Sequence, residues 1–479
     1  MTPPSHRELA PVLAVGGVGA ALSLAFSFRI PAMADEFVYQ AGAALFADTN
    51  SLASTYYFTD SILTIGYPHQ DAHSPGYVMV LGLVSRIVGP GYWTAVALNV
   101  GSLLVSLALL WSLACGLARP RGVRLLTTAA IVIPASLAYT SWVMPEWLVV
   151  AVSLATLWLS VRWGTRPFGA VLCGLALGIC ILIRESGIFL IPVLLLLIGL
   201  SRVRLPLFAG SFLAFHFLVF APLNAGRPPV ATTTVSGSAG NSAAFRAIRE
   251  GRIAFAADQL AKRTERNLKT LPVAGHEQQL TLLLLVALPA LAWMSWREID
   301  HRARLTLVGL SVGFIAMVAA TLTVSDLVNW NGPRYWTILA VPFFCLLPAP
   351  TTLTRKGLLF LLVALGFMTT SSILTTFRRF KSHTSSIDEI AYFDRFAPPG
   401  SYSRVIWQNG YKLGLARYPT EVIVSIPRSR KEYRALERAV WFDYVVLSTW
   451  QDALDARENY VLANAADPDP LLKIFRRLR

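Results

Sequence analysis

The chain has 479 residues, of which 54% are hydrophobic and only 14% are charged. Soluble globular proteins carry about 25% charged residues, and a single soluble core stops growing near about 250–300 residues. The composition therefore excludes an ordinary soluble protein and indicates a chain that crosses a membrane many times. The net charge of +15 does not indicate nucleic-acid binding, because much of it lies in short loops between apolar runs.

The first apolar run, Leu9–Phe28, is followed by "AMA" at Ala32–Ala34, which has the A-x-A form of a signal-peptidase site. The run is longer than the roughly 7–15 residues of the apolar region of a signal peptide. We therefore predict that it stays in the chain as a transmembrane helix. Cleavage is the alternative, and it would leave Asp35 at a new N-terminus.

Further apolar runs approach the length of about 17–25 residues that a helix needs to span a bilayer. They are Trp93–Leu117, Leu125–Trp142, Glu146–Val161, Phe168–Ile183, Gly187–Leu200, Leu207–Leu223, Gln279–Trp296, Leu305–Val324, Tyr335–Leu347 and Gly357–Phe377. We therefore predict an α-helical polytopic membrane protein with about 11 transmembrane helices.

Five loops between these runs are basic: "ARPRGVR", "RWGTRP", "SRVR", "WREIDHRAR" and "TRKG". A short apolar stretch, Gly76–Val88, decides on which side they lie. If it does not cross, all five loops are cytoplasmic, together with the N-terminus; if it crosses, all five are outside. Because basic loops prefer the cytoplasm, we predict that Gly76–Val88 is a juxtamembrane or re-entrant helix.

This topology places four segments outside: Arg29–Tyr92, the turn "SWVMPEW", Asn224–Glu277 and the tail from about Arg378. The third contains a basic amphipathic helix, "FRAIREGRIAFAADQLAKRTERNLK". In the tail, "SIDEIAYFDRFAP" predicts a helix, and "RVIWQ", "EVIVSIP" and "DYVVLS" predict short buried strands. We therefore predict a transmembrane catalytic domain at residues 1–377 and a small α/β extracytoplasmic domain at residues 378–479.

Two adjacent acids, Asp35 and Glu36, lie a few residues beyond the first run. They precede "FVYQAGAALFA", which is typical of an amphipathic helix at the membrane interface. Acids are common at a solvated loop edge, which is one interpretation of the pair. A carboxylate held against the bilayer is also a usable general base, and the residues alone leave both interpretations open.

The stretch "YPHQDAHSPGY" places His69 and His73 four residues apart with Asp71 between them. On one helix face two such histidines could bind a metal. Pro68 and Pro75 oppose a regular helix, so hydrogen-bonding loop histidines are the favoured interpretation. A divalent metal stays open.

Four more charged residues interrupt or begin apolar runs on the outer side. Arg184 and Glu185 in "ILIRESG" form either a self-neutralising turn or part of a functional site, since ionisable residues at membrane depth are functional candidates. Arg334 in "NGPRYW" is either an interfacial anchor beside Tyr335 or a phosphate ligand. Glu146, after Pro145, also suits a helix N-terminus, where the helix dipole favours an acid.

These motifs together resemble the GT-C superfamily of membrane glycosyltransferases. The bacterial branch related to protein O-mannosyltransferases and to the aminoarabinose transferase of lipid A is most similar. The resemblance is carried by "ADEFVY", "HSPGYVMVLGLVSRIVG", "VMPEW", "IRESGIFLIPVLLLL" and "GPRYWTILAVPFF", in that order along the chain. It covers about Pro31 to Pro350.

The resemblance implies a role for each candidate. Asp35 would be the base that deprotonates the acceptor hydroxyl, with Glu36 beside it, and Glu146 would position acceptor or donor. Arg184 and Arg334 would bind the lipid phosphate, where they stabilise charge on the leaving group. The histidines are a departure, since relatives often have other residues there. We nevertheless include His69, Asp71, His73 and Tyr335 in the predicted substrate-binding set.

We therefore predict an inverting glycosyltransferase in a bacterial inner membrane, with its active site and C-terminal domain facing outward. The donor would be a sugar on a polyprenyl phosphate, and the acceptor a hydroxyl of a lipid, glycan or protein. Two alternatives remain from other classes. One is a transporter or flippase of lipid-linked sugars, for which His216 in "AFHFLVF" is the residue deep in a span. The other is a surface-polysaccharide polymerase or ligase.

Overall fold

The computed structural model describes residues 6–25, 34–57, 62–63, 67–68, 70, 74–116, 140, 143–225, 247–248, 250–270, 301–324, 388–407, 421–423, 430–448, 460–468 and 470–478. The chain forms two compact units. The first is Met1–Ser27, Val96–Leu223 and Ala243–Thr376, and the second is Phe28–Ala95, Asn224–Ser242 and Phe377–Arg479. Contacts thus group the predicted first outer loop with the C-terminal tail. The division into a catalytic and an extracytoplasmic domain stays a prediction.

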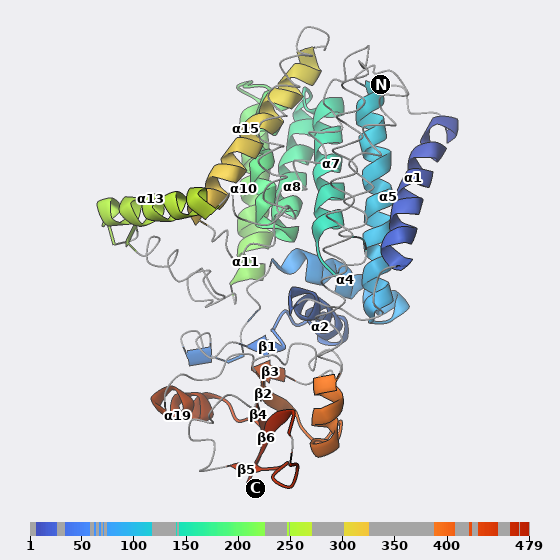
Figure 1. Ribbon diagram of the computed structural model, residues 1–479. Coiled ribbons are helices and arrows are strands. Elements are labelled where there is room, and N and C mark those ends of the chain that lie inside the picture. Colours follow the sequence, from blue (N-terminus) through green and yellow to red (C-terminus); the bar gives the residue numbers. More distant parts are fainter. Residues whose placement is uncertain are drawn as a thin grey trace. The chain divides into compact units, whose positions relative to one another are not determined.

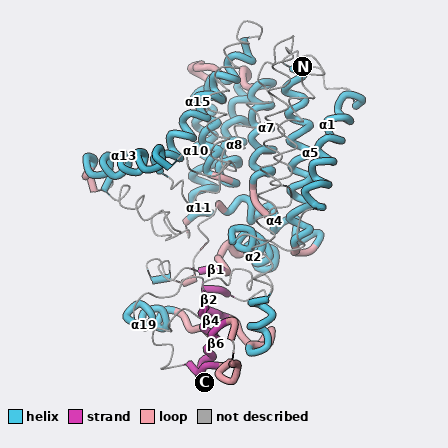
Figure 2. The backbone as a smooth tube through the Cα atoms, viewed as in Figure 1, coloured by secondary structure: helices cyan, strands magenta, loops and turns pink. Residues whose placement is uncertain are grey.

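The regular elements described in the first unit are helices (Figures 1 and 2). They are α1 (His6–Ala25), α5 (Tyr92–Gly116), α7 (Glu146–Trp163), α8 (Pro167–Ile183), η1 (Glu185–Leu190), α9 (Ile191–Ile198), α10 (Arg204–Phe215), η2 (His216–Phe220), α11 (Ala221–Asn224), α13 (Ile253–Thr270) and α15 (His301–Val324). Four described helical segments are long and apolar enough to cross a membrane: Tyr92–Leu113, Glu146–Trp163, Arg204–Asn224 and His301–Ala320.

These helices confirm the predicted mostly helical membrane-protein class. The predicted runs Glu146–Val161, Phe168–Ile183 and Leu305–Val324 fall within α7, α8 and α15. Four other predicted spans lie outside the described residues apart from Thr140: they are Leu125–Trp142, Gln279–Trp296, Tyr335–Leu347 and Gly357–Phe377. The count of 11 helices therefore stays a prediction.

Small and weakly polar residues let α8 pack closely against its neighbours. Ser153 of α7 lies 3.2 Å from Cys180 of α8, measured between Oγ and Sγ. At Gly174, a Cβ atom would come within 2.5 Å of the backbone oxygen of Phe208 in α10. Lipid supplies no hydrophobic drive between helices, so packing of this kind holds them together.

Basic residues gather at one end of these helices. Arg162 and Arg166 flank the turn from α7 to α8, which run antiparallel (Figure 1). Arg302, the second residue of α15, donates from Nη1 to the backbone oxygen of Val161, 3.3 Å away. Arg204 begins α10, which runs parallel to α8 because Gly174 faces Phe208 and Gly178 faces Phe215. The start of α7 and the end of α8 therefore lie at the opposite end.

The second unit begins with two helices of the first outer loop, α2 (Ala34–Thr49) and α4 (Pro75–Val88), which pack against each other. A side chain at Gly82 would meet the backbone oxygen of Ala43 at 2.9 Å, so glycine permits this contact. With 14 residues, α4 is about 21 Å long, short of the about 30 Å of bilayer hydrocarbon. Its length agrees with the predicted juxtamembrane helix.

The second unit also contains a six-stranded sheet in the order β1-β3-β2-β4-β6-β5. The strands are β1 (Tyr56–Tyr57), β2 (Arg404–Trp407), β3 (Glu421–Ile423), β4 (Tyr444–Ser448), β5 (Tyr460–Leu462) and β6 (Leu472–Arg477). Strands β1, β3, β2 and β4 pair in parallel with their neighbours. Strand β6 pairs antiparallel with β4, and β5 pairs antiparallel with β6. The three strands predicted in the tail correspond to β2, β3 and β4. The edge strand β1 comes from the first outer loop.

Apolar side chains cover both faces of this sheet, because its strands are hydrophobic at successive positions. One face packs against α2 and the helix at residues 388–396, through residues such as Phe37 and Phe393. The other face packs against α19 (Arg430–Ala439), through residues such as Leu436. Neighbouring residues alternate between the two cores: Val405 belongs to the first and Ile406 to the second.

Candidate functional site

In the first unit, the sequence-predicted residues Glu146 and Arg184 form a buried ion pair. Arg184 Nη1 donates to Glu146 Oε1 over 2.7 Å, and the two side chains are 11% and 2% exposed. Glu146 is the first residue of α7, directly after Pro145, and Arg184 is the residue that follows α8. Because α7 and α8 are antiparallel, the start of α7 lies beside the end of α8. Glu146 and Arg184 meet there, although they are far apart in the sequence.

The backbone around Arg184 fixes its position. The chain leaves α8 at Arg184 in an extended conformation and continues at once into the 3₁₀ helix η1. The N–H of Arg184 bonds to Cys180 O at 3.0 Å, and the N–H of Gly187 bonds to Arg184 O at 3.0 Å. A Cβ at Gly187 would meet Cys180 Sγ at 2.9 Å, so glycine allows the sharp turn. The turn that the sequence indicated at Arg184 is therefore present.

The Glu146–Arg184 pair lies at the end of α7 and α8 that is opposite to the basic turn. The second carboxylate oxygen, Glu146 Oε2, is buried and has no hydrogen-bond partner among the described residues. A buried charge is tolerated only when it is paired, and such pairs contribute little net stability. A guanidinium has five donors in a planar fork that fits carboxylate and phosphate groups. Arg184 therefore belongs to a residue type that can bind a phosphate as well as the Glu146 carboxylate.

In the second unit, the adjacent acids lie in the first turn of α2. Asp35 and Glu36 are its second and third residues, where the helix dipole favours negative charge. The Glu36 side chain is 1% exposed. The side chain of Asp35 lies outside the described residues. A helix is therefore present where the sequence predicted one, and the acids lie in its first turn. Its position at a membrane interface stays a prediction.

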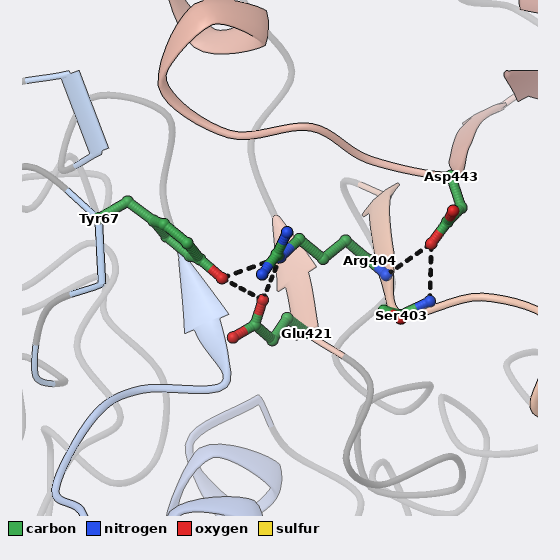
Figure 3. A network of polar contacts seen from close by, with 5 residues as sticks. All are labelled: Tyr67, Ser403, Arg404, Glu421 and Asp443. Atoms are coloured by element: carbon green, nitrogen blue, oxygen red, sulfur yellow. Dashed lines mark hydrogen bonds and ion pairs between the residues drawn. The ribbon is translucent and has the colours of Figure 1, made fainter. Parts of the chain in front are cut away.

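A second polar cluster joins the first outer loop to the sheet (Figure 3). Arg404 Nε donates to the hydroxyl oxygen of Tyr67 at 2.8 Å and also to Glu421, to which the Tyr67 hydroxyl itself donates. The Arg404 guanidinium lies over the rings of Tyr67 and Trp441, 5.0 Å from each centroid. Burial, together with the neighbouring Glu421 carboxylate, raises the pKa of Tyr67, so its hydroxyl stays a donor.

Sequence reasoning did not find this cluster. It singled out "YPHQDAHSPGY" for its histidines, and Tyr67 begins that stretch. Arg404 and Glu421 belong to strands in the tail whose charged residues carry no local motif. The contact between Tyr67 and Arg404 joins positions 337 apart in sequence, and no local pattern specifies it.

The remaining predicted site residues, His69, Asp71, His73, Arg334 and Tyr335, lie outside the described residues. The part of the chain that the structure describes contains no group of three or more potential metal ligands. Of the predicted residues, the structure brings Glu146 and Arg184 into direct contact.

No protein-family model matches this chain, and no curated protein matches it in sequence. Solved structures do match. ArnT from Cupriavidus metallidurans bound to undecaprenyl phosphate has a TM-score of 0.56 at 13% identity, over 98% of this chain and 97% of that one.

The apo state of the same ArnT has a TM-score of 0.54 at 13% identity, over 91% of this chain and 92% of that one. The oligosaccharyltransferase from Archaeoglobus fulgidus reaches 0.49 at 11% identity, over 91% and 69% of the two chains, which is too distant to support an argument. At these identities the likeness concerns the fold alone: this chain has a fold similar to that of ArnT, a transferase of the kind that the motifs resemble.

Proposed function

We propose that this protein is a glycosyltransferase that moves a sugar from a polyprenyl-phosphate donor to an acceptor hydroxyl at the outer face of a bacterial inner membrane. The observation that carries the proposal is the position of Arg184. It is a buried cation at the end of α7 and α8 opposite the basic turn, in a chain with the fold of ArnT. The ArnT structure was solved with undecaprenyl phosphate bound.

The sidedness rests on the distribution of charge in the first unit. Arg162, Arg166, Arg204 and Arg302 lie at one end of the helices, which the positive-inside rule assigns to the cytoplasm. With 18 residues, α7 is about 27 Å long, close to the thickness of the hydrocarbon core. Arg184 is then at the outer headgroup level, where a lipid-linked phosphate would be.

The proposed reaction is an inverting displacement. The Asp35 carboxylate accepts the proton of the acceptor hydroxyl, whose oxygen attacks the anomeric carbon from the side opposite the phosphate. The bond from the anomeric carbon to the phosphate oxygen breaks, and the polyprenyl phosphate leaves with the electron pair. Arg184 and Arg334 stabilise the charge of that leaving group. Glu146 holds Arg184 in place through the 2.7 Å hydrogen bond.

The transporter alternative has weaker support. His216, which the sequence places deep in a span, stacks on Phe220 with ring centroids 5.1 Å apart and packs edge-on against Phe217 at 5.3 Å. These aromatic neighbours come from its own helical segment. Such surroundings do not favour a polar relay across the membrane, where ionisable residues pair with one another.

The test is a transfer assay with purified protein in a bilayer and polyprenyl-phosphate sugars extracted from the host. Loss of sugar from the lipid and its gain by an acceptor are followed by mass spectrometry. We expect transfer by the wild type and none by Asp35→Asn, while Asp48→Asn, an exposed change on the same helix, keeps full activity. Transfer by Asp35→Asn would remove that residue from the mechanism. A donor bearing a diphosphate would instead favour the polymerase or ligase.

A further inference from the structure

The helix that carries the candidate acids has its buried face in the core of the C-terminal sheet. Phe37, Val38 and Ala41 of α2 are 2%, 9% and 0% exposed. They belong to the same apolar cluster as Phe393 and Tyr444 of the tail. Asp35 and Glu36 directly precede these residues on the helix. The position of the acids therefore depends on how α2 packs against the sheet.

The segment after α2 is held by the same sheet. Strand β1 pairs in parallel with β3, with Tyr56 opposite Val422. The N–H of Val422 donates to Thr55 O at 2.9 Å. Tyr56 belongs to the core shared with α2, and Tyr57 to the core shared with α19. The first outer loop thus supplies a layer and an edge of the C-terminal domain.

The Tyr67 hydroxyl forms the next attachment along the loop, through Arg404 and Glu421 (Figure 3). The Arg404 and Glu421 side chains are 21% and 25% exposed, so this ion pair is largely shielded from water. Arginine suits the place because its planar guanidinium both donates hydrogen bonds and stacks between two aromatic rings. His69, Asp71 and His73 follow Tyr67 in the sequence.

We propose that the C-terminal domain positions the first outer loop for transfer, and that Tyr67 and Arg404 are positioning residues for the reaction. This inference rests on the proposed function. Three separate attachments to one sheet, namely α2, β1 and Tyr67, restrict the freedom of the loop between Ala34 and Pro75. In bound reactants, a misplacement of about 1 Å can cost about 10²-fold in rate. The domain then acts on turnover more than on donor binding.

The experiment compares Tyr67→Phe and Arg404→Lys with a matched control, Tyr392→Phe. Tyr67→Phe removes one hydroxyl and keeps the ring. Tyr392→Phe makes the same change in the same unit, where the Tyr392 hydroxyl donates to Asp467 at 2.6 Å and accepts from Asn464 at 2.9 Å, both in the tail. Each variant is assayed in a bilayer for kcat and for the KM of the lipid donor, and its thermal midpoint is measured.

We expect Tyr67→Phe and Arg404→Lys to lower kcat by about tenfold or more with little change in KM, since the loss is one of alignment. The double variant should lose no more than the worse single variant, because the two residues act as one unit. Tyr392→Phe should lower the thermal midpoint and leave kcat unchanged. An equal loss of kcat in Tyr392→Phe would show that Tyr67 and Arg404 contribute to stability and not to positioning.

A second measurement does not depend on activity. Hydrogen exchange at residues 50–74 should quicken in Tyr67→Phe and Arg404→Lys and stay as in the wild type in Tyr392→Phe. Unchanged exchange in all variants would overturn the attachment itself. If the loop loosens and kcat holds, the attachment has no role in positioning. A wild type that transfers no sugar from any polyprenyl phosphate contradicts the proposed function. The exchange data would still show whether Tyr67 and Arg404 hold the loop to the sheet.

Discussion

Arg184 Nη1 lies 2.7 Å from Glu146 Oε1, with both side chains almost fully withdrawn from solvent. The contact ties the end of α8 to the start of α7. Two buried charges cost several kcal/mol of desolvation, and their attraction roughly offsets that cost. Such a pair is weak evidence for a purely stabilising role. The proposed role in phosphate binding can be separated from stability by neutralising the charges singly and together.

We expect Arg184→Gln and Glu146→Gln each to lower the stability of the folded protein by about 3–5 kcal/mol, because each leaves a buried charge without its partner. The double variant, with two neutral amides, should recover much of this stability. It should remain inactive in sugar transfer because the phosphate loses its cation. Thermal unfolding in detergent and the transfer assay measure the two effects.

An exposed ion pair provides the control for that comparison. Lys262 and Asp258 of α13 are paired at 2.8 Å, with side chains 69% and 49% exposed. Lys262→Gln should change stability by less than about 1 kcal/mol.

Wild-type transfer by the double variant of Glu146 and Arg184 would exclude a contact between Arg184 and the donor.

Within the described residues, predicted apolar runs coincide with helices, because an apolar run long enough for a bilayer has few other structures open to it. The predicted run for α7 begins at the helix's first residue, Glu146, and the predicted juxtamembrane stretch Gly76–Val88 lies within α4. The break between α8 and α9 was also visible, since Arg184 and Glu185 interrupt two apolar runs. Local composition is sufficient for features of this kind.

The contacts between distant segments were not predictable in this way. Glu146 and Arg184 were proposed as separate candidates, and their pairing depends on how α7 and α8 align. Strand β1 is two residues long, "YY", and no alternating pattern marks it. Its place at the edge of a sheet in the tail depends on β3, more than 360 residues later, at Glu421–Ile423. The role of Tyr67 follows from the same long-range packing.

We expect Gly174→Ala in α8 to destabilise the protein by about 1–3 kcal/mol, the range for overpacking a close contact. The added methyl group would lie 2.5 Å from Phe208 O and would also clash with Ser211 Oγ, both in α10. Gly210→Ala is the matched control, because nothing lies within 4 Å of a Cβ at that position of α10. It should be neutral or slightly stabilising, since alanine favours helix over glycine. Equal thermal midpoints for the two variants would contradict the close contact of α8 with α10.

Asn464 should be essential for the stability of the second unit. Its amide group donates to Tyr392 Oη at 2.9 Å and to Leu472 O at 2.6 Å, and its oxygen accepts from Ile474 N at 3.1 Å. The side chain is buried, at 3% exposure. Asn464→Leu removes the side-chain partner of Leu472 O and of Ile474 N, and an unsatisfied buried polar group costs about 1–3 kcal/mol; the Tyr392 hydroxyl keeps its bond to Asp467. We expect the C-terminal sheet to lose protection from hydrogen exchange, while α7 and α8 of the first unit keep theirs. Uniform protection throughout would show that the amide bonds are dispensable.

Alkaline pH should destabilise the second unit through its buried tyrosines. Burial raises the pKa of Tyr460, and the nearby Tyr433 and Glu437 raise it further. Burial likewise raises the pKa of Tyr433 and of Tyr67. In the unfolded chain a tyrosine titrates near about pH 10. Above that pH the unfolded chain therefore binds fewer protons than the folded one, and the free energy of unfolding falls.

We expect the thermal midpoint of the second unit to be constant up to about pH 9 and to fall as the pH rises past about 10. Tyr460→Phe removes one of the groups that cause the fall. It should lower the midpoint at neutral pH, because the hydrogen bond from the Tyr460 hydroxyl to Phe442 O at 3.1 Å is lost. It should also make the midpoint fall less steeply as the pH rises past about 10. Ultraviolet titration of the phenols gives an independent measure, with the protein in guanidinium as the reference in which all tyrosines ionise near about pH 10. Identical titration curves for the folded and the denatured protein would show that these hydroxyls are accessible to solvent, and the alkaline limb would then need another cause.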